Sequence, residues 1–251
     1  MIREKLMENH VGRPADFRWR GHEVSRIEGL SDAVFAFAIT LLVVSLEVPK
    51  TFDELAETMH GFGAFLISFA LLFFVWFGQY KFFRRYGLRD TITVVLNAGL
   101  LFVVLFYVYP LKFLFTFLVD RVMGGHGEVR LPNGNVVPMI ESNEQMASLM
   151  TIFNLGYVAV FGVFVLLFWH AYRKREALEL NELERFDTRE TMLESALNCG
   201  IAIVSLLVLV IGGVGRAGLA GMAYMLTPIV MTLNGKIMGV RRKKLVTRIQ
   251  G

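Results

Sequence analysis

The chain has 251 residues, of which 55% are hydrophobic and only 19% are charged. Soluble domains contain about 45–50% apolar and about 25% charged residues, so this composition is unusual for a protein in water. Five stretches contain no Asp, Glu, Lys or Arg, and each can cross a hydrocarbon core of ~30 Å as a helix. These stretches are residues 61–80, 91–111, 146–169, 195–215 and 217–235. These five uncharged runs exclude a soluble enzyme, a disordered chain and a nucleic-acid-binding domain, despite the net charge of +4.

A sixth apolar stretch, residues 33–46, is shorter and lies between Asp32 and Glu47. Carboxylates at this depth are rare, and they usually face protein or water rather than lipid. With this stretch extended to both acids, we predict an all-α membrane protein with one transmembrane domain over residues 1–251. The six predicted spans are residues 28–48, 61–82, 91–118, 146–171, 192–213 and 217–238.

The connections between the predicted spans are short, with two exceptions. Residues 119–145 contain clustered Gly, Pro and Asn residues, which predict a turn-rich loop. Residues 173–191 are charged and contain no long apolar run, so we predict a helical extension of the fourth span there.

The basic residues are distributed asymmetrically over the predicted connections. Most of the 26 Lys and Arg residues lie in the N-terminal arm, in the connections after the second and fourth spans, or at the C-terminal end. The exceptions are Lys50, Lys112, Arg121, Arg130 and Arg216. The positive-inside rule then predicts that both termini are cytoplasmic. Because topology accounts for the excess of basic residues, no nucleic-acid partner is needed to explain it.

The sequence contains no pattern typical of a catalytic or metal site. There is no phosphate-binding glycine loop and no arrangement of nucleophile and base, and Cys199 is the only cysteine. We therefore predict no enzyme activity, no catalytic residues, no bound metal and no cofactor.

The first span has a distinctive face. At about 100° per residue, Phe37, Leu41 and Val44 lie along one stripe, and Thr40 flanks it. One interpretation is an ordinary bundle helix in which the Thr40 hydroxyl bonds to its own backbone. The other is a pore-lining helix in which the three apolar side chains form constrictions. Helical geometry favours the first interpretation and does not exclude the second.

Polar residues gather where the first span begins and the second span ends. Arg26, Ser31 and Asp32 lie at the start of the first span, and Trp76 and Gln79 arrive at a similar depth. These side chains could form one polar network between the two helices, since a buried charge needs a partner. Alternatively, Ser31 or Asp32 caps the first helix and Trp76 is an interfacial residue.

The segment Arg26-x-x-x-Leu30-Ser31-Asp32, followed by AVFAFAITLLV, resembles the R-x-x-x-F-S-D signature of the transmembrane protein 175 family. Members of this family are potassium-permeable channels, and prokaryotic members have one repeat of six helices. The resemblance implies a homotetramer in the cell membrane of a prokaryote, with four first helices lining a central pore. Potassium is then the permeant ion and the lipid bilayer is the surrounding partner.

The resemblance also implies roles for individual residues. Phe37, Leu41 and Val44 correspond to the narrow region of the pore, and Thr40 corresponds to a threonine linked to potassium preference. The family's structural network corresponds to Arg26, Ser31 and Asp32, with support from Trp76 and Gln79. A ring of Glu47 side chains would attract cations at the outer mouth.

This sequence departs from the family pattern at three positions. Leu30 replaces the usual Phe of the motif, and Phe37 is bulkier than the usual Ile or Leu. Gln79 and Tyr80 stand where the family typically has a pair of histidines, so a pH-sensitive role of the network is in doubt.

Two other classes of function remain open from the sequence. A secondary transporter would need a polar site at the bilayer midplane, often formed by broken helices. Its only sequence indications are Asn97, Asn154, Asn198 and Pro228. A membrane scaffold that conducts no ions is the second alternative.

Overall fold

The computed structural model describes residues 17–44, 50–52, 55, 59, 61–130 and 135–250. Within these ranges, six helical segments are long and apolar enough to cross a membrane, so the predicted all-α fold with six spans is confirmed. The first five are α2 (Arg26–Val44), α4 (Phe62–Tyr86), α5 (Thr91–Val122), α6 (Asn143–Arg173) and α7 (Glu182–Gly212). The sixth segment, residues 214–249, includes most of α9 (Leu226–Gln250).

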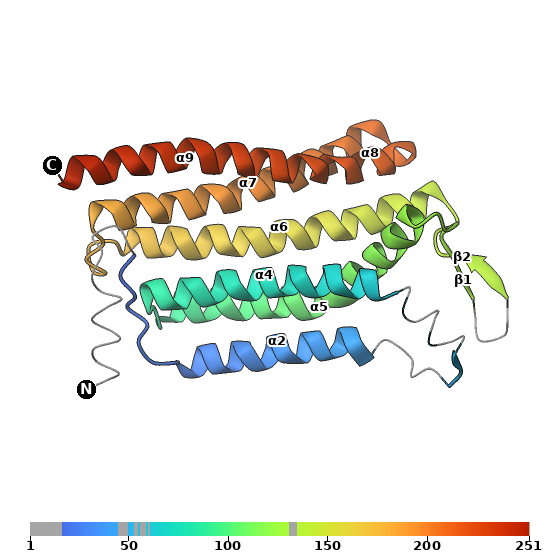
Figure 1. The fold of residues 1–251 in the computed structure, drawn as a ribbon, viewed down its shortest axis with the longest axis horizontal. Coiled ribbons are helices and arrows are strands. Elements are labelled where there is room, and N and C mark those ends of the chain that lie inside the picture. The colour runs from blue at the N-terminus through green and yellow to red at the C-terminus, as the bar shows by residue number, and fades with distance from the viewer. Residues whose placement is uncertain are drawn as a thin grey trace.

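The long helices lie side by side in an elongated bundle, with α2 along one edge and α9 along the other (Figure 1). Successive helices run in opposite directions. The helices α2, α5 and α7 begin at one end of the bundle, where α4, α6 and α9 finish (Figure 1). We call this the basic end, because it carries the Arg- and Lys-rich helix ends such as Arg84, Arg173 and Arg248.

Two predicted boundaries are corrected by the structure. The charged segment after the fourth span does not extend that span, because α6 ends at Arg173 and α7 already begins at Glu182. The sixth span is not one continuous α-helix. It consists of η1 (Val214–Arg216), α8 (Ala217–Met222) and η2 (Ala223–Met225) before α9. Glycines at 213, 215, 218 and 221 explain the break, since glycine is a poor helix former.

Side chains at the helix starts explain where two helices begin. The Asp90 carboxylate accepts a hydrogen bond from the Thr93 backbone at the start of α5. At the start of α7, Asn181 and Glu184 form a capping box, in which each side chain bonds to the backbone of the other residue. Such caps satisfy backbone N–H groups that have no partner inside the helix.

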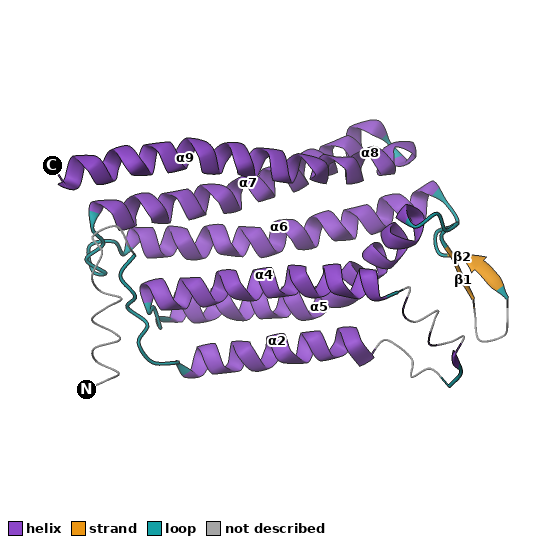
Figure 2. Cartoon of the chain, viewed as in Figure 1, coloured by secondary structure: helices purple, strands orange, loops and turns teal. Residues whose placement is uncertain are grey.

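The connection between α5 and α6 contains the two strands among the described residues (Figure 2). Strands β1 (Glu128–Arg130) and β2 (Val136–Pro138) pair antiparallel, with Val129 opposite Val137. The hairpin lies at the opposite end of the bundle from the basic end (Figure 1). The turn-rich loop predicted from the sequence therefore contains a small hairpin.

The centre of the bundle is formed by α5 and α6, whose most apolar windows are each 39% buried. By contrast, only 22% of the residues in the most apolar windows of α2 and α4 are buried. Near the basic end, an aromatic cluster joins α4 to α6. The rings of Phe82, Tyr86 and Phe168 lie within 5.2–6.1 Å of each other, and the three side chains are nearly inaccessible to solvent.

A tight helix contact at Gly156 gives a testable prediction about packing. A methyl group on Gly156 of α6 would overlap the ring of Tyr107 on α5. That ring is buried, and its hydroxyl donates a 2.6 Å hydrogen bond to the Phe153 carbonyl, so it has no room to move. We expect Gly156→Ala to lower the free energy of unfolding by about 1–3 kcal/mol, as overpacking does.

The matched control for this substitution lies on the same helix. A methyl group on Gly162 meets no atom within 4 Å. Gly162→Ala is therefore expected to be neutral or to stabilise the helix by about 0.5–1 kcal/mol. Denaturation of the purified protein followed by circular dichroism measures both effects. Equal stability of the two variants would show that the Tyr107 contact is not restrictive.

Candidate ion-conduction site

Helix α2 has one buried stripe, and the rest of its surface is largely open. Ser31, Phe35, Ala38 and Leu42 are buried against α4 and α5. Phe37 is 56% exposed, and the residues around it on this face, Ala33, Ala36, Thr40 and Val44, are also exposed. A single chain therefore leaves one side of α2 for contacts with lipid, water or another copy.

The predicted pore residues are distributed unevenly with respect to this open face. Phe37, Thr40 and Val44 are exposed, whereas Leu41 is half-buried and packs against the core. The Thr40 hydroxyl donates a 2.9 Å hydrogen bond to the Ala36 carbonyl, so its oxygen retains acceptor capacity toward the open face. Glu47, predicted for the outer mouth, lies outside the described residues.

The predicted network between the first two spans forms as two separate contacts. In the first contact, the Trp76 indole N–H donates a 2.8 Å hydrogen bond to the Asp32 carboxylate. Asp32 is exposed and Trp76 is half-buried, so this pair lies at the margin of the α2–α4 contact.

The second contact is a buried chain of side-chain amides that joins three helices. Gln79 on α4 donates a 2.6 Å hydrogen bond to the Asn97 side-chain carbonyl on α5. The Asn97 amide in turn donates to the Ser31 hydroxyl of α2 at 2.9 Å, and Ser31 donates to the Ile27 carbonyl. All three polar side chains are at most 2% exposed. This series of hydrogen bonds fixes the rotation of α2 against α4 and α5.

Sequence reasoning missed the place of Asn97 in this chain. An isolated asparagine in an apolar span has no periodic signal, and the sequence indicates it only as part of a transporter site. A usable signal was present, because α5 begins at Thr91 at the basic end. Asn97 is therefore carried to the same depth as Ser31 and Gln79.

Arg26 does not join either contact. It is exposed at the first position of α2, and no hydrogen bond or ion pair joins its side chain to another described residue. Ser31 and Asp32 do not cap the helix, because they lie in its second turn. The cap is formed by Ser25 and Glu28, whose side chains bond to each other's backbone N–H groups at 3.3 and 2.9 Å.

The other asparagines that suggested a transporter are bonded within the chain. The Asn154 carbonyl oxygen accepts a 2.6 Å hydrogen bond from Tyr224, and that of Asn198 accepts a 2.7 Å bond from Tyr157. These contacts join α6 to its neighbours, which is a structural use of the amide groups. Pro228 lies within the first turn of α9, where proline is compatible with a helix.

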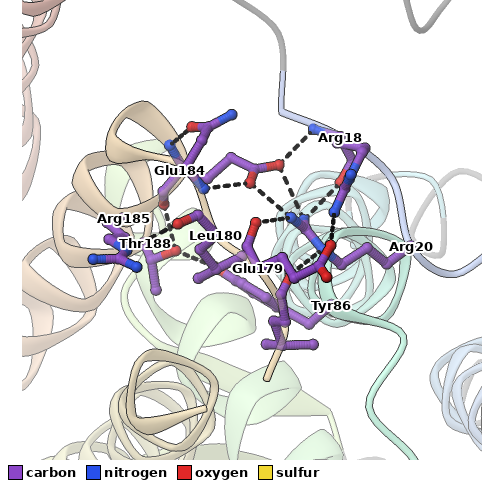
Figure 3. A network of polar contacts seen from close by, with 10 residues as sticks. Arg18, Arg20, Tyr86, Glu179, Leu180, Glu184, Arg185 and Thr188 are labelled. Atoms are coloured by element: carbon purple, nitrogen blue, oxygen red, sulfur yellow. Dashed lines mark hydrogen bonds and ion pairs between the residues drawn. The ribbon is translucent and has the colours of Figure 1, made fainter. Parts of the chain in front are cut away.

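The residues before α2 form a strap, here defined as residues 17–22, across the basic end (Figure 3). The Arg20 guanidinium bonds to both oxygens of Glu184, at 3.0 and 2.7 Å, and to the Leu178 carbonyl at 2.8 Å. Glu184 is only 2% exposed. The backbone N–H groups of Arg20 and Gly21 both donate to the Arg84 carbonyl. The strap thus ties the end of α4 to the start of α7, and it leads directly into α2.

A second polar cluster at the basic end joins α5 to α6. The Asp90 carboxylate lies 2.7 Å from Nε2 of His170 and also bonds to the Lys174 ammonium. Partial burial raises the pKa of Asp90, but the hydrogen bonds from Lys174, Thr93 and His170 outweigh it. The resulting pKa lies well below the usual value of the carboxyl group.

This shift predicts how stability changes with pH. A depressed folded-state pKa stabilises the protein fully above the unfolded-state pKa, near pH 4, and the contribution is lost as the pH falls further. We expect Asp90→Asn to lower the melting temperature at neutral pH, and the gap from wild type to narrow below about pH 4. Thermal melts at several pH values measure this. Glu176→Gln is the control, because Glu176 is exposed and its ion pair with Arg175 spans 3.6 Å. A constant gap across the pH range would contradict the prediction.

Among the described residues, no group of three or more His, Cys, Asp or Glu side chains is placed to hold a metal ion. The helices instead define a multi-pass α-helical membrane protein. Its first span has a buried face locked by amides and an open face that carries a hydroxyl between apolar side chains.

Comparisons with known proteins agree with this class. Residues 26–107 match the family model described as the endosomal/lysosomal potassium channel TMEM175. A protein of Marivirga tractuosa named potassium channel is 38% identical over 245 residues, covering 96% of this chain and 98% of that protein. A second potassium channel, from Chamaesiphon minutus, is 34% identical over 107 residues, covering 39% of this chain and 52% of its own.

A crystal structure is similar over nearly the full length. It shows a variant of the potassium channel MtTMEM175 in complex with a nanobody fusion protein. This structure has a TM-score of 0.77 and 39% sequence identity, and it covers 90% of this chain and 98% of its own. The chain therefore belongs to the TMEM175 family of potassium channels.

Proposed function

We propose that the chain forms a homotetramer that conducts potassium ions through a central pore lined by α2. One observation carries this proposal. The stripe of α2 with Phe37, Thr40 and Val44 is exposed, whereas the other side of the same helix is buried and is held by the hydrogen bond from Asn97 to Ser31. One such helix cannot enclose a pathway, whereas several copies around an axis can.

In this arrangement the exposed side chains of α2 act as rings. Rings of Phe37 and Val44, narrowed further by the half-buried Leu41, would exclude water and act as the gate. The Thr40 hydroxyl oxygens would replace part of the hydration shell of potassium between the apolar rings. Glu47 would attract cations at the outer mouth, and no cofactor other than the permeant ion is required.

The polar contacts of α2 have a positioning role in this proposal. The buried chain of Ser31, Asn97 and Gln79 holds the helix rotation that turns Phe37 away from its own chain. Asp32 supports the same rotation through Trp76. The proposal assigns no positioning role to Arg26. The basic end faces the cytoplasm of a prokaryotic cell, in accord with the positive-inside rule.

Single-channel recording of the purified protein in a planar bilayer tests the proposal. Under a potassium/sodium gradient, unitary currents that reverse toward the potassium equilibrium potential are expected. The mass of the detergent-solubilised particle should equal four chains. Saturable flux coupled to a counter-ion would identify a transporter instead, and absence of all flux would identify a scaffold.

A further inference from the structure

A groove that the conduction pathway does not use runs along the other side of α4. This lateral groove has a volume of about 830 Å³ and is lined by residues of α4, α5, α6, α7 and α9 (the helices are seen in Figure 1). Small-molecule sites typically have volumes of about 300–1,000 Å³, so the groove can hold a sizeable ligand. No residue of α2 lines it.

The groove changes in character along its length. Toward the bundle centre most of its lining is apolar, including Val75 of α4, Val104 of α5 and Phe164 of α6. The uncharged polar side chains of Tyr157 and Asn198 also line the groove. Toward the basic end it is lined by charged side chains, namely Lys81, Arg85, Asp187, Glu190, Glu194 and Arg242. An amphiphile with an apolar tail and a charged head matches this gradient.

The length of the groove corresponds to one leaflet of a bilayer. Its lining on α4 runs from Leu71 to Arg85, which is about 21 Å along a helix axis at about 1.5 Å per residue. Half of a bilayer, including its headgroup layer, is about 20–23 Å thick. The charged end of the groove therefore lies at headgroup depth, and the apolar part extends toward the bilayer midplane.

The charged side chains at the polar end of the groove indicate which kind of lipid headgroup fits there. Arg242 is already bonded to both oxygens of Asp187, at 2.8 and 3.0 Å. By contrast, Lys81 and Arg85 have no acidic partner within 4.0 Å among the described residues. Lys81 instead lies over the Phe77 ring, at 4.4 Å from its centroid.

Two acids at the same end are likewise without an ion pair. Glu190 and Glu194 line the groove, and no described basic group lies within 4.0 Å of either carboxylate. These side chains thus comprise two cations and two anions, which attract one another across the groove without a direct ion pair. A head that carries both a phosphate and an ammonium group complements them, whereas a purely anionic head would face the acids.

We propose that the lateral groove binds one phospholipid whose head contains a phosphate and a primary amine. The phosphate contacts Lys81 and Arg85, the ammonium group donates to Glu190 and Glu194, and one acyl chain lies in the apolar part. Charge-assisted hydrogen bonds of this kind are the stronger ones. The proposal concerns lipid binding and is independent of ion conduction.

Native mass spectrometry of the full chain, stripped of lipid by detergent washing, tests the proposal. Dioleoyl lipids with phosphoethanolamine, phosphocholine or phosphoglycerol heads are titrated separately. We expect the phosphoethanolamine lipid to bind once per chain and about tenfold more tightly than the other two. Equal retention of the three lipids by the wild-type protein, or retention of none, would overturn the proposal without any need for variants.

Paired variants locate the bound lipid. Lys81→Gln with Arg85→Gln, and separately Glu190→Gln with Glu194→Gln, are each expected to weaken phosphoethanolamine lipid binding about tenfold. The control is Lys243→Gln with Lys244→Gln, two exposed residues of α9 that do not line the groove. An equal loss in the control would show that general surface charge holds the lipid, which would overturn the site.

A third variant tests the apolar part of the groove. Val75→Trp is expected to fill the groove and abolish retention of the lipid, whereas Val95→Trp, at a 62% exposed position of α5, should leave retention unchanged. Undiminished binding by Val75→Trp would place the lipid elsewhere and overturn the proposal.

Discussion

Arg20→Ala is expected to lower the free energy of unfolding by about 3–5 kcal/mol, because it leaves the buried Glu184 carboxylate without its charge partner. The guanidinium bonds to both carboxylate oxygens, and the side chains are only 12% and 2% exposed. The same substitution removes the bond to the Leu178 carbonyl, so the strap also loses its contact with the turn before α7. Denaturation of the solubilised protein, followed by circular dichroism, measures the change.

The neighbouring residue provides a matched control. Arg18 forms an ion pair with Glu179 at 3.6 Å, but these side chains are 54% and 82% exposed. Exposed pairs contribute about 0–1 kcal/mol, so Arg18→Ala should change stability little. If both variants were equally stable, the burial of Glu184 would not be the source of the effect.

Phe37→Ala is expected to increase potassium flux in reconstituted vesicles about tenfold, which corresponds to lowering the barrier by about 1.4 kcal/mol. Phe37 is the bulkiest side chain on the open face of α2, and apolar rings obstruct ions by excluding water. In the proposed pore, alanine would widen the constriction and remove part of that barrier. The measurement is potassium efflux at a fixed protein-to-lipid ratio.

Phe102→Ala is the control for this substitution. Phe102 is 71% exposed on α5, so it matches Phe37 in residue type and accessibility but lies on another helix. Flux through the Phe102 variant should equal that of the wild type. Unchanged flux in Phe37→Ala, or an equal rise in both variants, would remove Phe37 from the constriction.

The number of spans was predictable from the sequence because charged residues separate six apolar stretches, and each stretch falls largely within its own helical segment. The start of α7 was not predictable from hydropathy, since its first turns are charged and are stabilised by the Asn181–Glu184 capping box. The break in the sixth span was not predictable either, although this segment is apolar rather than charged. Its glycines are compatible with high hydropathy but not with a long regular helix.

The candidate site was predictable in part. The periodicity of α2 places Phe37, Leu41 and Val44 on one stripe, but it did not identify the stripe of Phe35, Ala38 and Leu42 that the structure buries. Spacing also brought Asp32 and Trp76 to one depth, where they bond. The partners of Ser31 and Gln79 depend on how α5 packs against α2, which is a tertiary contact with no local pattern. For the same reason, the exposure of Arg26 could not be read from its motif.

The shallow attachment of α2 has a consequence for assembly. This helix is held in its own chain by one narrow stripe, and Ala33 and Ala36 leave its outer surface small. In a bilayer, lipid tails solvate that surface as well as a second copy would, so association depends on close packing rather than on escape from water. Dilution of the protein with lipid, at constant protein concentration in the sample, should therefore shift the equilibrium from assembled to separate chains.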